Sequence, residues 1–546
     1  MTRAQRLTLV ATILASTVVF LDATVVNVAL PAMERDLGMG LAGQQWVVEA
    51  YLLALVSLLL VGGSLGDHFG RRRIFAIGLA GFGVTSILCA LAPDTGVLIG
   101  LRGLQGLAGA LLVPGSLAIL TSTFNGEARG RAIGTWTAWS GISTIAGPAA
   151  GGFFTEAISW RFVFWINVPL IAVTLLLTVH SVAESRDPAV VRGFDIPGVL
   201  LSALGLGGPV FALIEQPTYG WSDPVVLVPL LAGVACFAAF IVREATARAP
   251  MLPLSLFRVR NFAVANAATL TTYAGLIGSS FFLTLYLQQV GGYSPLAAGL
   301  ASVPVSLMLF VLSPRFGAFT AGVGPRLPMA LGPIVGGLGL LLLVRVGTRP
   351  DYLTEVLPAL LVFGLGLAAT VAPLTTTVLN AVDEHNAGIA SGTNNAISRV
   401  AGLLAIAVMG AAVSSQFDSS VSDHLARADL SPQAQHVITS AKSRPLAGGD
   451  EADKLSSSER DSVGGAIEAS SRDAFQLAAL IGACLMVAGG LTSGVGIQNP
   501  RRRPAIRPAP ARAATAGECG RGAPFRDTEP VPGSLEPASS AAEAPL

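Results

Sequence analysis

The stretch LTLVATILASTVVFLDATVVNVAL, residues 7–30, contains one ionisable side chain, Asp22. A helix needs about 20 apolar residues to cross the hydrocarbon core of a membrane, so this stretch is long enough to span it. Arg3 and Arg6 precede it as they would in a signal peptide, but the apolar run continues to Pro31 without a clear cleavage site. We therefore expect a retained membrane-spanning helix that carries a buried acid.

Similar apolar stretches recur along nearly the whole chain of 546 residues, of which 52% are hydrophobic and 12% are charged. Soluble domains carry roughly 25% charged residues, so this composition excludes a soluble globular enzyme. The runs are continuously apolar rather than alternating, which predicts helices and not the strands of a membrane β-barrel. The expected spans are residues 7–30, 46–65, 74–92, 97–121, 134–157, 162–181, 196–216, 225–242, 262–286, 296–314, 327–346, 356–379, 397–413 and 474–497.

Arginines near these spans lie almost entirely on one side. The side that holds the N-terminus and the even-numbered connections includes Arg71–Arg73, Arg399 and the arginines of the C-terminal tail. The short connections of the other side hold only Arg35, Arg161, Arg345 and Arg349. Because cytoplasmic loops carry the excess of basic residues, we expect a multi-pass protein of the cytoplasmic (inner) membrane with both termini in the cytoplasm.

Charge and residue spacing exclude several classes of function. A net charge of +1 gives no basic surface for nucleic acid. The four cysteines and five histidines do not stand at metal-ligand spacing, so neither a metal site nor a disulfide framework is expected. The chain has no Gly-x-x-x-x-Gly-Lys-Ser/Thr loop, which argues against a self-contained ATP-driven pump.

An internal repeat indicates two related halves. GLAGALLVPGSLAILTSTFNGEARGRAIG, from Gly106, resembles GLGLAATVAPLTTTVLNAVDEHNAGIASG, from Gly364. With a one-residue slip, the repeat pairs Pro114 with Pro373, Gly130 with Gly388 and Gly134 with Gly392. Repeated halves around a central site are typical of secondary transporters.

We therefore expect an all-α integral membrane protein with 14 transmembrane helices, arranged as six, two and six in two pseudo-symmetric halves. The predicted division is 1–183 for the N-terminal half, 184–250 for two inserted helices and 251–497 for the C-terminal half. Residues 414–473 form a long polar external loop that is either a small cap or disordered. Residues 498–546, rich in Pro, Ala and Arg, predict a disordered cytoplasmic tail.

The turn after the second span carries a distinctive pattern, Gly63-Ser-Leu-Gly-Asp67-His-Phe-Gly70-Arg71-Arg72-Arg73. Its glycines allow a tight turn, and Asp67 can accept hydrogen bonds from the arginines and from the start of the third span. Taken alone, such a turn can also be a plain topology anchor.

Three further stretches accompany this turn: LDATVVNVALP at residues 21–31, LIGLRGLQG at 98–106, and Gly134 followed by GPAAGG at 147–152. Together the four patterns resemble the major facilitator superfamily, specifically its fourteen-span drug:proton antiporter branch, over about residues 7–500. The chain has Ser143 where the branch usually has glycine, and the second-half copy of the basic turn is reduced to Arg315, Gly324 and Arg326.

The resemblance implies roles for particular residues. Proton coupling would involve Asp22 and Arg102. The cytoplasmic gate would use Gly63, Asp67, Gly70, Arg71 and Arg72. The antiporter motif, associated with exporters, would comprise Gly134, Gly147, Pro148, Gly151 and Gly152; a glycine beside a proline also predicts a kink and a close helix contact.

The few ionisable groups inside the spans support coupling independently. Asp22, Arg102 and Glu49 fall at neighbouring depths in the outer half of the bilayer. A charge near the bilayer centre costs about 2.5 to 3.5 kcal/mol on insertion scales, so an acid there is expected to have a purpose. A carboxyl that alternates between an apolar surrounding and an arginine changes its affinity for protons.

Structural roles remain open for these residues. Asp22 could bond a neighbouring helix, Arg102 could order the N-terminal half, and Glu49 could extend to the outer surface. If Glu49 faces a cavity instead, it would favour cationic substrates. Aromatic residues in or beside spans 2, 5 and 9 are candidates for binding lipophilic substrates, although they can equally face lipid. They are Trp46, Tyr51, Trp136, Trp139, Tyr273, Phe281 and Tyr286.

We therefore expect a monomeric exporter, not an enzyme, that exchanges external protons for lipophilic, cationic drugs or antibiotics by alternating access. It would use the proton motive force and no cofactor. One alternative is a dedicated exporter of one metabolite, such as the host's own antibiotic, an amino acid or a siderophore. Another is a membrane sensor or structural protein on a transporter scaffold.

Overall fold

The computed structural model describes residues 1–186, 195–247, 250, 252–383, 387–426, 430–446, 452 and 455–499. Residues Met1–Asn499 form one compact unit. Nearly all of the predicted tail, 498–546, lies outside the described residues, as do 187–194 and 248–249 of the predicted inserted segment.

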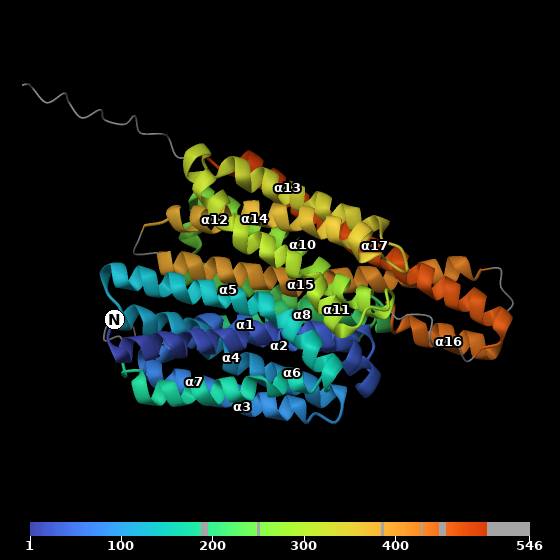
Figure 1. Ribbon diagram of the computed structural model, residues 1–546, viewed down its shortest axis with the longest axis horizontal. Helices are drawn as coiled ribbons and strands as arrows, with labels where there is room; N and C mark the ends of the chain where they lie inside the picture. The colour runs from blue at the N-terminus through green and yellow to red at the C-terminus, as the bar shows by residue number, and fades with distance from the viewer. Residues whose placement is uncertain are drawn as a thin grey trace, which may run out of the picture. The chain divides into compact units, whose positions relative to one another are not determined.

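The regular structure of the described residues is helical throughout (Figure 1). The α-helices are α1 (Arg3–Leu37), α2 (Leu41–Phe69), α3 (Arg71–Ala90), α4 (Thr95–Thr123), α5 (Gly126–Ala157), α6 (Phe162–Trp165), α7 (Asn167–Ser181), α8 (Ile196–Tyr219), α9 (Pro224–Thr246), α10 (Arg260–Gln289), α11 (Pro295–Ala301), α12 (Val303–Val323), α13 (Arg326–Leu342), α14 (Leu357–Asn380), α15 (Ala387–His424), α16 (Pro432–Lys442) and α17 (Ser457–Gly496). Three short helices of other types are η1 (Leu254–Arg258), η2 (Leu343–Arg345) and η3 (Tyr352–Val356).

Among the described residues, 13 helices are long and apolar enough to cross a membrane. Each coincides with one of the predicted spans, which confirms the all-helical membrane fold. The predicted fifth span, 134–157, lies within α5, a helix of 32 residues that is not among the 13. The count of fourteen spans, and the division into six, two and six, therefore stay predictions.

The last two long helices extend well beyond their predicted spans. α15 begins at Ala387 rather than at 397, and α17 begins at Ser457 rather than at 474. Much of the predicted external loop 414–473 is therefore helical, with α16 between the ends of α15 and α17 (Figure 1). We call the described part of this segment, around α16, the cap; its external position stays a prediction. The apolar runs predicted spans too short because both helices continue with polar residues.

Several helices approach each other closely at glycine residues, which have no side chain to separate the backbones. A Cβ atom on Gly106 of α4 would collide with the Tyr51 carbonyl oxygen of α2, and one on Gly366 of α14 would collide with Gly336 of α13. Small residues let helix backbones approach closely, which is a main source of packing between helices in membranes.

α5 is tightly packed at one end and open at the other. A Cβ atom on Gly130, Gly134 or Gly141 would meet nothing within 4 Å, whereas one on Gly151 would lie 2.5 Å from the Val25 carbonyl oxygen of α1. Gly152 is equally blocked by α11. The half of α5 that begins at Gly126 therefore borders open space.

α15 shows the same change along its length. Gly388 and Gly392 have nothing within 4 Å, but Gly402 is packed against Ile277 of α10 and Gly410 against Gln45 of α2. The repeat pairs these two open glycines with Gly130 and Gly134, so the corresponding helices of the two predicted halves are open at corresponding ends.

Candidate functional site

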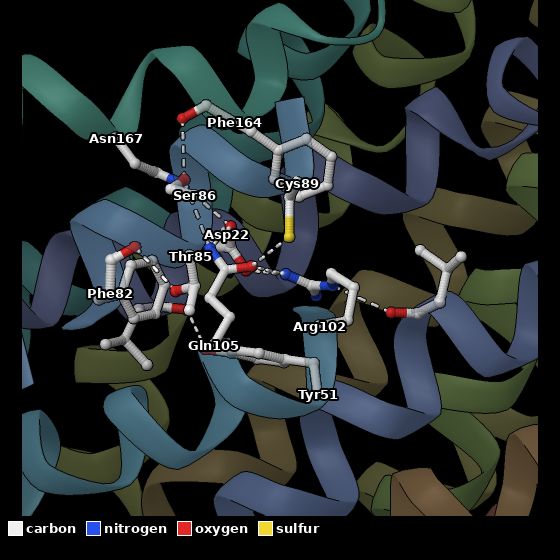
Figure 2. Close-up of polar contacts among 12 residues, drawn as sticks. Asp22, Tyr51, Phe82, Thr85, Ser86, Cys89, Arg102, Gln105, Phe164 and Asn167 are labelled. Atoms are coloured by element: carbon white, nitrogen blue, oxygen red, sulfur yellow. Dashed lines mark hydrogen bonds and ion pairs between the residues drawn. The ribbon is translucent and has the colours of Figure 1, made fainter. Parts of the chain in front are cut away.

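The structure brings Asp22 and Arg102 into direct contact. Nη1 of Arg102, on α4, donates to Oδ2 of Asp22, on α1, at 2.6 Å (Figure 2). Asp22 is fully buried and Arg102 is 1% exposed. The two residues predicted to couple protons are therefore a desolvated ion pair between two helices.

Further groups from α2, α4 and α7 complete a polar network around this pair (Figure 2). Asp22 Oδ1 accepts from Gln105 Nε2 at 3.1 Å and from Asn167 Nδ2, on α7, at 3.0 Å. Arg102 donates further to Gln105 Oε1 at 2.8 Å and to the Val47 carbonyl of α2 at 3.0 Å. The ionised carboxylate thus accepts three hydrogen bonds, and the network joins α1, α2, α4 and α7.

α3 contributes a second layer to this network. The Ser86 hydroxyl accepts from Asn167 Nδ2 at 3.1 Å and donates to the Phe164 carbonyl at 2.9 Å. Neither Ser86 nor Asn167 was predicted as a site residue. The signal available for Asn167 was a lone amide within the apolar run of its span; nothing in the sequence connected it with Asp22.

Aromatic rings cover the arginine. The Tyr51 ring centroid lies 4.3 Å from the guanidinium carbon of Arg102, and the Phe164 centroid lies 5.7 Å from it. Tyr51 is fully buried, and its hydroxyl donates to the Val19 carbonyl at 3.3 Å. These rings exclude water, and they stabilise the cation by interaction with their π faces. The structure places Tyr51 in the ion-pair site; its predicted contact with substrate stays a prediction.

The ion pair holds two opposite charges away from water. While Asp22 is ionised, its charge is balanced by Arg102 and its oxygens are satisfied. Protonation would remove the ion pair and leave Arg102 as a buried cation without its counter-charge, which is costly in a dry site. Loss of either charge would therefore weaken the contact between α1 and α4.

Glu49 lies on a different side of α2. It is fully buried, so it does not extend to the surface, and neither carboxyl oxygen has a hydrogen-bond partner among the described residues. Trp46 and Leu53, one turn before and after it, both contact α8: the Trp46 indole donates to Glu215 at 2.9 Å, and Leu53 packs against Gly207. One turn before Glu49, Gln45 Nε2 also donates to the Ile406 carbonyl of α15 at 2.7 Å. Glu49 therefore lies on a part of α2 that contacts both α8 and α15, and it makes no hydrogen bond with the Asp22–Arg102 pair. Its predicted role in substrate binding stays a prediction.

The remaining aromatic candidates have separate surroundings. The Trp136 indole donates to Ser16 at 2.9 Å, whereas Trp139 is 51% exposed. The Tyr286 ring stacks on Phe475 with centroids 4.1 Å apart. Tyr273 is half-buried, and Phe281 packs against Phe282. The contacts of these side chains do not define one aromatic site.

The basic turn connects α2, α3 and the segment after α7 through an ion pair and a hydrogen bond. Gly70 adopts a φ of 112°, which favours glycine. Arg71 Nε donates to Asp67 at 2.7 Å. The backbone N–H of Arg72 donates to Glu184 Oε1 at 3.1 Å, so a carboxylate that follows α7 caps the start of α3. Gly63 faces Pro114 of α4.

The reduced copy of this turn in the second half has a partner that the sequence did not indicate. Gly324 also has a positive φ, 85°, before α13. The backbone N–H of Arg326 donates to Asn499 Oδ1 at 3.0 Å, and Arg326 Nε donates to the Gly494 carbonyl at 2.6 Å. Asn499, after α17, thus occupies the position that Glu184 has after α7. The reduced motif keeps its geometry with an amide in place of the acid.

The antiporter motif presses α5 against α1 and α11. Gly147 and Gly151 lie against Thr24 and Val25 of α1, and Gly299 of α11 lies against the Pro148 carbonyl. Ser143, where the branch usually has glycine, is buried and donates to Thr17 Oγ1 of α1 at 2.9 Å. The serine therefore adds a hydrogen bond to the contact between α5 and α1.

Comparison with known proteins agrees with this geometry. Residues 12–406 match the family model of the Major Facilitator Superfamily. The multidrug resistance protein Stp of Mycobacterium tuberculosis is 37% identical over 82% of this chain and 84% of its own length. The puromycin resistance protein pur8 of Streptomyces alboniger is 38% identical over 76% of this chain and 83% of its own length. The chain belongs to the major facilitator superfamily.

Solved structures support the fold. A bacterial homologue of the human lysosomal transporter Spinster, in an inward-facing and unoccupied conformation, superposes with a TM-score of 0.64 at 16% identity, over 92% of this chain and all of that one. The xylose transporter XylE from E. coli, in an inward open conformation, gives 0.54 at 13% identity, over 92% and 98%. Because the chain belongs to this family and is similar to its resistance proteins, the protein is a multi-pass membrane transporter of small molecules and not an enzyme.

Proposed function

We propose that the protein is a monomeric antiporter that exports lipophilic drugs or antibiotics across the cytoplasmic membrane in exchange for protons. The resistance proteins to which the chain is similar support export as the direction of transport. The observation that carries the coupling is the buried Asp22–Arg102 pair, because it offers one carboxylate whose protonation state changes the forces between helices.

The open ends of α5 and α15 give the proposed cycle its starting state. Arg129 and Arg131 lie near the open end of α5, and the positive-inside rule assigns that end to the cytoplasm. The substrate would enter there while Asp22 is ionised. After the protein opens outward and releases the substrate, an external proton would neutralise Asp22 and favour the return.

Gradient-driven export in everted vesicles tests this proposal. We expect Asp22→Asn to abolish proton-driven export, because asparagine cannot exchange a proton, while the protein still reaches the membrane in normal amounts. Asp36→Asn is the matched control: Asp36 lies on the same helix but is paired with Arg161 at the surface. Export by Asp22→Asn at the wild-type rate would remove this carboxyl from the mechanism.

A dedicated exporter of one compound is the second candidate. It is favoured by relatives whose names refer to single antibiotics, such as the tetracenomycin C resistance and export protein of Streptomyces glaucescens, 34% identical over 78% of both chains. A panel of unrelated dyes and drugs separates the two. Protection against several unrelated classes supports a multidrug exporter, and protection against one class supports a dedicated one.

A further inference from the structure

One face of α15 borders the open space and ends in an arginine. Gly388, Gly392, Asn395 and Arg399 are separated by four, three and four residues, so they lie on one side of the helix. The two glycines have nothing within 4 Å, and Asn395 is exposed. Further along the same helix, Gly402 is packed against Ile277. Arg399 therefore lies where the open stretch ends.

Arg399 is deeper in the protein than its sequence position predicted. The apolar pattern predicted a span that begins at 397, two residues before Arg399, but α15 begins at Ala387, which puts Arg399 about 18 Å along the helix at 1.5 Å per residue. The predicted start was wrong because the polar segment before residue 397 is helical. Arg399 therefore lies well inside the helix and not beside its first residue.

No hydrogen bond or ion pair joins Arg399 to any described residue. Arg399 makes a cation–π contact with Phe20 of α1, whose ring centroid lies 5.5 Å from the guanidinium carbon. The side chain is half-buried. Among the described residues, the hydrogen-bonding groups of this guanidinium thus have no partner, while its carbon lies over the Phe20 ring.

The internal repeat shows that this charge belongs to one half only. Gly130 and Gly134 of α5 pair with Gly388 and Gly392 of α15, and at the same spacing Gly141 takes the place of Arg399. A Cβ atom on Gly141 would also meet nothing within 4 Å. The open stretches thus correspond in position but differ in charge: one ends in glycine and the other in a cation.

We propose that Arg399 binds the acidic group of the transported compound, so that lipophilic acids bearing a carboxylate or a similar anion are preferred substrates. A guanidinium offers paired donors that match a carboxylate, and Phe20 provides apolar surface for the rest of the molecule. Glu49, the acid that suggested cationic substrates, is fully buried beside α8 and does not compete for this role. This inference rests on the proposed export function and names the substrate class of its site.

Equilibrium binding to the purified protein in lipid nanodiscs tests the proposal. The probes are dansylglycine, dansylphenylalanine and dansyltryptophan, each compared with its own amide by dansyl anisotropy after subtraction of empty nanodiscs. We expect the wild type to bind at least one acid about tenfold more tightly than its amide. Arg399→Met should abolish that preference with little change for the amide, and Arg399→Lys should retain part of it. Arg345→Met, at an exposed arginine outside this face, is the control.

Three results would overturn the proposal: no acid is preferred by the wild type, Arg399→Met keeps the preference, or Arg399→Met weakens acid and amide equally. The last would assign Arg399 a structural role. Binding at equilibrium needs no proton gradient, so failure here leaves proton-driven export standing. Conversely, export that does not depend on Asp22 leaves the preference for acids measurable.

Discussion

The carboxylate of Asp22 accepts hydrogen bonds from three side chains, Arg102, Gln105 and Asn167. They come from α4 and α7, so the pair is both a charge balance and a clamp on α1. The two charges of this ion pair depend on each other, because removal of either partner leaves the other desolvated and unpaired.

Arg102→Ala is therefore expected to be as damaging to export as Asp22→Asn, and also to lower stability. Loss of one partner from a buried pair typically costs about 3 to 5 kcal/mol. Export from everted vesicles and thermal unfolding in detergent measure the two effects. Arg102→Lys keeps the charge but loses the forked geometry, so partial export is expected. Full export and an unchanged melting temperature in Arg102→Ala would show that the pair is needed neither for transport nor for stability.

The sequence predicted that Asp22 and Arg102 act together, but it did not predict the residues that contact them. Asp22 and Arg102 could be placed together because both are ionisable groups at similar depth in apolar spans. Ser86 and Asn167 could not, because neutral polar residues are common in such spans and their contact with Asp22 depends on how α3 and α7 pack. Asn499 was missed because its relation to Gly324 depends on folding α17 back against α13.

α5, the helix of the antiporter motif, is tightly packed at one end and unpacked at the other. Gly151 of α5 is blocked by backbone of α1, whereas Gly134 on the same helix faces open space. If α5 moves between two conformations during transport, its packed end must keep a close fit with α1, and its open end must be able to pack against another surface.

This contrast predicts different effects for the same substitution. Gly151→Ala places a Cβ 2.5 Å from the Val25 carbonyl oxygen, and backbone cannot yield as a side chain can. Overpacking of this kind costs about 1 to 3 kcal/mol, so we expect a lower melting temperature and reduced export. Gly134→Ala is the matched control and should leave the melting temperature unchanged. Equal melting temperatures for both variants would contradict the packing described here.

The helix boundaries show what apolar patterning can and cannot predict. Membrane spans could be located because lipid demands continuous apolar runs. The ends of α15 and α17 could not, because beyond the apolar runs these helices continue with polar residues that carry no such signal. For the same reason Arg399 was expected at the start of its helix, although α15 begins 12 residues before it.

The cap around α16 links distant parts of the chain on the side that is closed. The Leu41 N–H at the start of α2 donates to the Ser443 carbonyl at 3.0 Å, and Arg444 pairs with Glu34 of α1 at 3.3 Å. Gln289 of α10 also donates to Glu34. Transport by alternating access requires contacts on this side to separate when the protein opens outward.

A reversible cross-link tests whether the cap must move. A Cβ on Gly40 would lie 3.6 Å from that of Ser443, within the separation of a disulfide, although it would also crowd the Ser443 carbonyl. In a background with the native cysteines replaced by alanine, oxidised Gly40→Cys/Ser443→Cys should lose export and regain it on reduction. Each single variant is a control. A formed disulfide that leaves export intact would show that this contact persists through the cycle.

The central claim is that Asp22 exchanges a proton during transport. The most direct measurement is proton release from the purified protein, in weakly buffered detergent solution with a pH-sensitive dye, on addition of a compound that it exports. Because the compound binds the form in which Asp22 is ionised, it should draw the protonated fraction of the protein into that form. We predict proton release by the wild type and none by Asp22→Asn, with release preserved in Asp36→Asn. Equal release by Asp22→Asn and the wild type would contradict the account.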